Sequence, residues 1–340
     1  MKRLVTVFAA LALLSSPAAG VAQSAPVIAD KSVRDDVFPT ITAPFPRGIV
    51  GRPHVEFANY VGYRPLQLDL YLHTDHRAAR PLILWIHGGG WSRGDARGSG
   101  AFADWPAVLA SLAARGYVVA AVDYRLSGEA RFPAQVQDVK AAIRFLRSKA
   151  GEYGIDPKRV YLWGGSAGGH IAALAATTCG VAAFDPVAST GRLPHSEAVR
   201  ATPLAQSDCV QGAAIWYGVF DLVTHGTEPG TALAPGNMAG LLGCAADACE
   251  AAERAASPAS YIKRDTPPML LIHGTADEEV SVDQTKRMAA QLGTAGVPVE
   301  TLLIPGANHG WIGKTSADTR RYSLLALDRT LAFFDSLARH

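Results

Sequence analysis

The sequence predicts an α/β protein whose sheet is mostly parallel, with an antiparallel N-terminal hairpin and helices on both faces. Continuous apolar runs are typical of strands buried on both faces. Helical patterns separate most of these runs, which predicts parallel strands joined by crossover helices. A strictly alternating stretch, LQLDLYL at 66–72, predicts a half-buried strand of an antiparallel edge. The six continuous runs lie at 81–86, 117–122, 160–163, 213–219, 269–272 and 300–304.

The expected elements follow this pattern along the chain. The stretch VEFANYVGY before 66–72 is expected to be its hairpin partner, with a turn near Gly62. In 134–149 the apolar residues recur at helical spacing on one face, and Pro133 suits a first helical turn. Further helices are expected at 102–115, 167–177, 283–292 and 319–338.

The N-terminus is typical of an export signal. Lys2 and Arg3 precede the apolar stretch 4–14, which is too short to span a bilayer, and small residues follow up to Ala22. We therefore expect a signal peptide at 1–22, no membrane anchor after its cleavage, and a periplasmic or extracellular protein. An uncleaved anchor is the alternative. Residues 23–53 are expected to be an extended lead-in, and 54–340 a single domain.

The charge balance argues against several classes of partner. The chain has 32 Lys and Arg residues against 30 Asp and Glu residues, so its formal net charge is +2. Without a basic stripe or charge run, nothing favours binding to nucleic acid or to an anionic surface. No motif indicates a metal or a cofactor. The oligomeric state is not predicted.

Four cysteines fit the expected export. An even number of cysteines in an exported chain indicates disulfides, and four allow three pairings. We favour Cys244–Cys249 as a local clamp and Cys179–Cys209 as a second link. Metal ligation and free buried thiols are the alternatives. All four residues lie in two Ala-, Gly-, Pro- and Ser-rich insertions, 179–211 and 222–266, which we expect to lie over the carboxyl ends of the strands.

The stretch LWGGSAGGH at 162–170 fits either a phosphate-binding loop or a nucleophile turn. A phosphate loop of the GxxxxGK[ST] type requires a lysine, which this stretch lacks. In the other glycine cluster Asp95 stands where that lysine would be. The sequence GGSAG fits GxSxG, directly after an apolar run and before a helical pattern, which is the context of a nucleophile turn. Ser166 is therefore the candidate nucleophile.

A serine nucleophile needs a base and an orienting acid. His309 lies in a glycine-flanked loop after the last apolar run and is the candidate base. Asp277 follows the run 269–272 by a short loop and is the candidate acid, with Asp221 as the main rival and Glu278 and Glu279 as weaker ones.

The motif HGGGW at 87–91 follows the apolar run 81–86. Backbone N–H groups of such glycines stabilise an oxyanion, so Gly89, Gly90 and Ala167, the residue after the nucleophile, are the candidate donors. Trp91, Trp216, Tyr217 and Trp311 adjoin these segments and could stack on a substrate, although they suit a core position equally well. Of these, Trp91 and Trp311 are the candidate substrate contacts.

With these motifs the chain resembles the α/β-hydrolase serine esterases of the HGGG type, related to hormone-sensitive lipase. It is most similar to secreted bacterial esterases that include feruloyl and acetyl xylan esterases. The resemblance covers roughly residues 55–338 and implies the α/β-hydrolase fold and the triad Ser166, Asp277 and His309. The chain departs from the hormone-sensitive lipase pattern because it lacks a substantial helical cap before HGGGW.

The expected function is hydrolysis of a small-molecule or polymer-linked carboxylic ester through an acyl-enzyme, with acetyl or feruloyl esters of plant polysaccharide as candidate substrates. A lactonase or an arylformamidase would use the same triad. A non-catalytic binding protein on the same fold is the alternative from another class.

Overall fold

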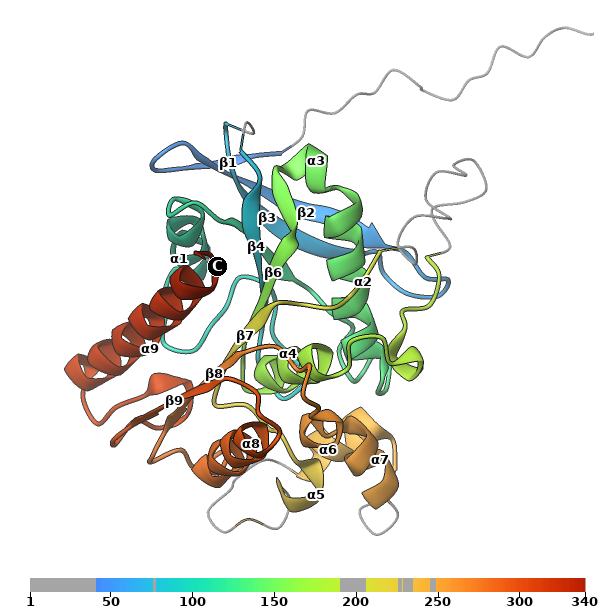
Figure 1. Cartoon of the computed structure of the whole chain (residues 1–340), viewed down its shortest axis with the longest axis vertical. Helices are drawn as coiled ribbons and strands as arrows, with labels where there is room; N and C mark the ends of the chain where they lie inside the picture. Colours follow the sequence, from blue (N-terminus) through green and yellow to red (C-terminus); the bar gives the residue numbers. More distant parts are fainter. Residues whose placement is uncertain are drawn as a thin grey trace, which may run out of the picture. The chain divides into compact units, whose positions relative to one another are not determined.

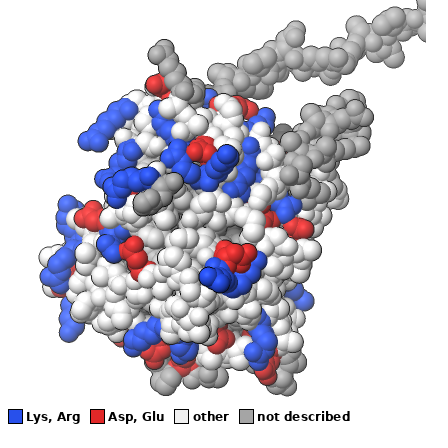
Figure 2. All heavy atoms as spheres, viewed as in Figure 1, with Lys and Arg blue, Asp and Glu red and all other residues white. Residues whose placement is uncertain are grey.

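The computed structural model describes residues 41–75, 78–189, 206–225, 228, 235–244 and 249–339. The expected signal peptide at 1–22 and residues 23–40 of the expected lead-in lie outside the described residues. Among the described residues, no helix is long and apolar enough to cross a membrane. Figure 2 shows acidic and basic side chains interspersed over one face of the molecule.

Within the described chain, nine strands form one sheet in the order β1-β2-β3-β5-β4-β6-β7-β8-β9 (Figure 1). Neighbouring strands from β5 to β9 are parallel, and β1, β2 and β3 add antiparallel pairs at one edge. The predicted fold class is therefore confirmed. The strands are β1 (Ala43–Phe45), β2 (Ile49–Ala58), β3 (Leu66–His73), β4 (Arg80–Ile86), β5 (Val118–Val122), β6 (Ile155–Gly165), β7 (Gly212–Trp216), β8 (Met269–Gly274) and β9 (Val299–Ile304).

The central strands are apolar on both faces because each face carries its own helices. In β4, Leu84 belongs to one buried cluster and Trp85 to another. Helices α2, α4 and α8 pack in the first cluster, and α1 and α9 pack in the second, on the opposite face (Figure 1). The helices are α1 (Trp105–Ala113), α2 (Ala134–Ser148), α3 (Ala150–Tyr153), α4 (Ala167–Thr177), α5 (Leu222–His225), α6 (Pro235–Leu242), α7 (Glu250–Ala256), α8 (Val282–Thr294) and α9 (Ser316–Leu337).

The N-terminal hairpin begins earlier than the sequence pattern predicts. Strand β2 starts at Ile49 and β1 at Ala43, inside the range expected to be an extended lead-in. The β2–β3 pairing is interrupted between Arg52 and Val55 and again between Glu56 and Ala58. Because each irregularity shifts the alternation of side chains, β2 has no period-two pattern by which it could be recognised.

Both favoured disulfides are present in the structure. Cys179 pairs with Cys209, and Cys244 pairs with Cys249. No described cysteine is free. The predicted pairing is therefore confirmed.

The first insertion, 179–211, does not begin at the carboxyl end of a strand as expected. Its described residues follow α4, which runs back from Ser166, and they lead into the amino end of β7. Arg147, the penultimate residue of α2, donates hydrogen bonds to the carbonyl oxygens of Ser207 and Cys209, both at 2.6 Å. The expectation is wrong because the insertion follows a helix rather than a strand.

The second insertion, 222–266, does begin at the carboxyl end of a strand. It contains α5, α6 and α7, and α6 reaches the glycine loop after β4. A Cβ added to Gly90 would lie 2.5 Å from Asn237 Nδ2 of α6. This insertion therefore forms a wall beside the glycine loop.

Candidate active site

Ser166 occupies a strained turn between β6 and α4. Its φ of 57° and ψ of −125° lie where L side chains rarely occur. A Cβ on Gly164 would approach the Gly168 carbonyl oxygen to 2.3 Å, and a Cβ on Gly168 would approach the Ile86 carbonyl oxygen to 2.1 Å. The turn thus requires glycine at both positions of the GxSxG motif.

The sheet brings three residues distant in sequence into one hydrogen-bonded chain. Asp277 follows β8 and His309 follows β9, so both lie at the edge where Ser166 leaves β6. His309 Nε2 lies 2.9 Å from Ser166 Oγ, and His309 Nδ1 lies 2.8 Å from Asp277 Oδ2. A carboxylate only accepts hydrogen bonds, so Nδ1 carries the proton and Nε2 is left to accept from the serine hydroxyl.

The rival acids take other roles. Asp221 Oδ1 accepts a hydrogen bond from the Val223 N–H at the start of α5. Glu278 accepts from the side-chain amide of Asn308. Glu279 lies 3.8 Å from His309 Nε2, which is the nitrogen that faces the serine. Only Asp277 contacts the nitrogen that an orienting acid must hold.

The side chain of Asp277 is fully buried and strongly hydrogen-bonded. Its Oδ1 accepts from the backbone N–H groups of Glu279 and Val280, both at 2.9 Å. His273 Nε2 lies 3.3 Å from its Oδ2. Burial alone would raise the pKa of this carboxyl, but the hydrogen bonds from His273 and His309 outweigh burial and hold the pKa well below its usual range. The carboxylate therefore stays ionised beside His309.

The glycine loop after β4 presents free backbone donors beside Ser166. A Cβ on Gly88 would lie 2.9 Å from the Gly165 carbonyl oxygen, so the loop is tightly packed against the nucleophile turn. In the described chain, no acceptor bonds the N–H groups of Gly89 and Gly90. Ala167 is the first residue of α4, so its N–H precedes the first hydrogen bond within that helix. Three donors are therefore available for a negatively charged oxygen.

Ser166 and His309 open onto a pocket of about 320 Å³. Tyr217, which follows β7, forms part of its wall, and its ring centroid lies 4.6 Å from that of His309. Burial raises the pKa of the Tyr217 hydroxyl, so this group stays neutral. The other lining residues are Trp85, His87, Gly88, Gly89, Gly90, Arg93, Gly94, Asp95, Gly98, Ser99, Gly100, Gly165, Glu279 and Gly310.

Trp91 and Trp311 do not line this pocket, and their prediction as substrate contacts is corrected. Trp91 is buried, and its Nε1 donates to His170 Nδ1 at 3.0 Å. Trp311 is fully buried against Trp216, with ring centroids 5.4 Å apart. Both residues adjoin a site loop in the sequence, but this position alone does not determine whether a side chain points into the pocket or into the core.

Tyr217, one of the aromatic residues that the sequence offered as a contact, and Glu279, which it did not, both line the pocket. Tyr217 directly follows the continuous run of β7, at the same strand edge as Ser166. Glu279 follows the acid by two residues and was considered only as a rival acid. Their places after strand ends were the available signal.

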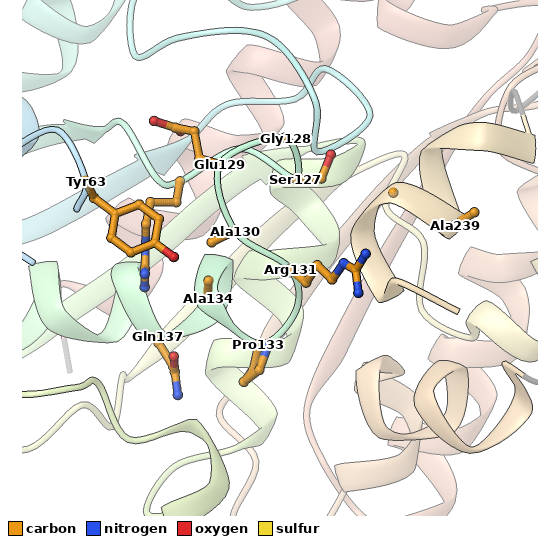
Figure 3. Close-up of a pocket in the computed structure, with 12 residues that line it drawn as sticks. Tyr63, Ser127, Gly128, Glu129, Ala130, Arg131, Pro133, Ala134, Gln137 and Ala239 are labelled. Atoms are coloured by element: carbon orange, nitrogen blue, oxygen red, sulfur yellow. The ribbon is translucent and has the colours of Figure 1, made fainter. Parts of the chain in front are cut away.

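A second hollow, of about 650 Å³, is separate from the triad (Figure 3). Tyr63, Ser127, Arg131, Gln137 and Ala239 are among the residues that line it, and none of its lining residues belongs to the triad. In the described part of the chain, no group of three or more His, Cys, Asp or Glu residues is placed to bind a metal ion. The pocket at Ser166 is therefore the candidate active site.

Comparisons with known proteins find esterases among the relatives of this chain. The family model BD-FAE matches residues 68–292. The esterase LipQ of Mycobacterium tuberculosis is 30% identical over 74% of this chain, which spans 55% of LipQ. The carboxylesterase NlhH from the same organism is 28% identical, with 80% of this chain and 81% of NlhH covered.

Two solved esterase structures are also similar to this chain. A truncated carbohydrate esterase from gut microbiota is 27% identical with a TM-score of 0.70, covering 87% of this chain and 99% of that one. Propionate-bound esterase 2 of Thermogutta terrifontis is 26% identical with a TM-score of 0.62. The match covers 84% of this chain and 93% of the Thermogutta chain.

Proposed function

The chain belongs to the BD-FAE family of α/β-hydrolase esterases, and we propose that it hydrolyses carboxylic esters through a covalent acyl-enzyme. The observation that carries this proposal is the chain of hydrogen bonds from Ser166 Oγ through both ring nitrogens of His309 to Asp277. A serine hydroxyl in this setting can lose its proton to the imidazole as it attacks a carbonyl carbon.

In the acylation step, His309 Nε2 takes the proton of Ser166 while Oγ forms a bond to the ester carbonyl carbon. The carbonyl oxygen becomes an oxyanion that the N–H groups of Gly89, Gly90 and Ala167 stabilise. Asp277 keeps the proton of His309 on Nδ1 and stabilises the imidazolium that forms.

His309 then gives its proton from Nε2 to the alcohol oxygen, and the bond between this oxygen and the carbonyl carbon breaks. Water enters and loses a proton to the same nitrogen as it attacks the acyl carbon. The resulting intermediate releases the carboxylic acid and restores the serine hydroxyl. Each proton is thus taken up and returned by one atom, Nε2, which lies 2.9 Å from Oγ.

For the substrate we propose a short acyl group, acetyl in preference to feruloyl, on a hydroxyl of a carbohydrate. The pocket of about 320 Å³ is at the small end of the range for ligand sites. The gut-microbiota neighbour is a carbohydrate esterase, and the Thermogutta enzyme binds propionate, a short acid. Trp91 and Trp311 are buried and do not line the pocket, so the two rings expected to stack on a feruloyl group are not available to it.

We also propose that the protein is exported. The leader pattern at 1–22 and the two disulfides support an oxidising compartment outside the cytoplasm. N-terminal sequencing of the protein from a periplasmic or culture fraction tests the cleavage after Ala22. An uncleaved N-terminus in both fractions would contradict it.

Ser166→Ala tests the reaction. On p-nitrophenyl acetate, we expect turnover to fall by a factor on the order of 10⁶ while the melting temperature is retained. With rapid acid quenching, wild type should carry an acetyl group on the peptide containing Ser166, and the variant should not. Full activity in the variant would disprove the assignment. A panel of acetyl, butyryl, feruloyl and lactone substrates then tests the acyl preference.

A further inference from the structure

Glu279 places a second carboxylate beside the reacting atoms. Its backbone N–H donates to Asp277 Oδ1 at 2.9 Å, so its main chain is held by the same turn that positions the acid. Its side chain reaches into the Ser166 pocket, where Oε2 lies 3.8 Å from His309 Nε2. The side chain is 55% exposed, which leaves the carboxylate accessible to a ligand.

The position of Glu279 identifies the part of a substrate that it meets. In the attack on an ester, the carbonyl carbon lies at Ser166 Oγ and the oxyanion points to the glycine loop. The alcohol oxygen must lie next to His309 Nε2, because that atom delivers its proton. Glu279 flanks this same nitrogen, so its neighbour is the alcohol portion of the ester rather than the acyl portion.

Glu279 is not a substitute for the orienting acid. That acid must bind Nδ1, and Asp277 already does so at 2.8 Å. A carboxylate on the Nε2 side cannot fix the ring tautomer that accepts the serine proton. Its chemistry is that of a charged hydrogen-bond acceptor at the edge of the pocket.

We propose that Glu279 is a specificity-determining residue for the alcohol side of the ester. Its carboxylate accepts a hydrogen bond from a hydroxyl on the carbon next to the ester-bearing carbon. It also disfavours an alcohol portion that carries a negative charge, because two anions would then face each other beside Nε2. The inference rests on the proposed function, since it assigns the alcohol side from the path of the proton.

Two pairs of acetate esters test the proposal, each compared as a ratio of kcat/KM values. The first pair is trans-2-acetoxycyclohexanol and cyclohexyl acetate, which differ by one hydroxyl. The second is acetoxyacetate and acetoxyacetamide, which differ by a charge. A ratio taken on one preparation does not depend on the fraction of enzyme that is folded.

The variants are Glu279→Leu, which removes the acceptor, and Glu279→Gln, which keeps a neutral one. Glu278→Gln is the matched control, because that side chain bonds Asn308 at 3.1 Å and does not line the pocket. Charged hydrogen bonds are stronger than neutral ones, and partial exposure weakens both. The hydroxyl preference should therefore fall roughly five- to tenfold in Glu279→Leu, by less in Glu279→Gln, and not at all in Glu278→Gln.

In the charged pair, loss of the carboxylate should raise the relative kcat/KM of the anionic ester, acetoxyacetate. Discrimination against acetoxyacetate should weaken about threefold in Glu279→Gln, and 0.5 M salt should weaken it in wild type by screening. Equal ratios in wild type and Glu279→Leu, for both pairs, would overturn the role of Glu279. Equal ester hydrolysis by wild type and Ser166→Ala would instead overturn the proposed function, so the two failures are distinguishable.

Discussion

His273 contacts the same carboxylate oxygen of the buried acid, Asp277, that His309 holds. Its Nε2 lies 3.3 Å from Asp277 Oδ2 and 2.9 Å from the Val280 carbonyl oxygen, and its Nδ1 lies 2.7 Å from Thr285 Oγ1. Both neighbours of Nε2 are acceptors, so Nε2 carries the proton and Nδ1 accepts from the threonine hydroxyl. A second imidazole thus donates to the carboxylate that orients the first.

Replacing His273 should therefore impair catalysis without any contact to substrate. We expect His273→Phe to lower kcat about tenfold with a small effect on KM, because Asp277 loses a buried hydrogen-bond donor. His273→Gln, which keeps a donor near the Nε2 position, should recover part of the loss. Steady-state kinetics with a melting curve for each variant provide the measurement. A kcat in His273→Phe within twofold of wild type would count against this positioning role.

The nucleophile turn gives a steric prediction. Gly164→Ala should abolish soluble folded protein or displace Ser166, because the new Cβ would lie 2.3 Å from the Gly168 carbonyl oxygen. Gly151→Ala in α3 is the matched control, since its Cβ would meet nothing within 4 Å. We expect the control to be neutral or slightly stabilising, as is usual for Gly to Ala in a helix. Circular dichroism and activity are measured on both, and an active, folded Gly164→Ala would contradict the described turn.

Three buried histidines predict how stability depends on pH. Burial lowers the pKa of His87, His170 and His225 to about 4. Between pH 6.5 and 4 the unfolded chain binds protons that the folded protein excludes. The free energy of unfolding should therefore fall with decreasing pH across this window, by about 1.4 kcal/mol per pH unit for each histidine. Above about pH 7.5 all three are almost entirely neutral in both states and contribute almost no slope.

His225→Phe isolates one of these contributions. Neither ring nitrogen of His225 has a hydrogen-bond partner within the described structure, so an apolar ring loses no such bond. The variant should be at least as stable as wild type at pH 7.5, and its decline toward pH 5 should be about one third shallower. Urea unfolding at several pH values measures both quantities. An unchanged slope would show that His225 is not excluded from protonation in the folded state.

Much of the fold could be predicted from local sequence. The parallel strands are recognisable because helices cover both faces, so β4 and its neighbours are apolar without interruption. Strand β2 was assigned too late because its bulges break the alternation. The start of 179–211 was misplaced although the helix expected at 167–177, directly before it, already carries the chain away from the strand end.

The candidate site was predictable where backbone chemistry dictates residue type. The glycines around Ser166 are required by close contacts, and Asp277 and His309 follow strands whose ends meet at one edge. The direction in which a side chain leaves a loop is set by tertiary packing. Trp91 and Trp311 therefore occupy the core positions that suited them equally well, and Glu279, taken only for a rival acid, faces the pocket.

The C-terminal helix ends on the side of the sheet where the parallel strands begin, which matters for how the protein could be attached to a surface. The end of α9 lies there, where Arg159 of β6 donates to the Ala338 carbonyl oxygen at 3.2 Å, and the Cys179–Cys209 bond lies at the same amino-terminal side of the strands. The Ser166 pocket opens at the opposite side. A protein tethered to a solid support through residues beyond Ala338 would therefore present its pocket outward, toward an insoluble substrate.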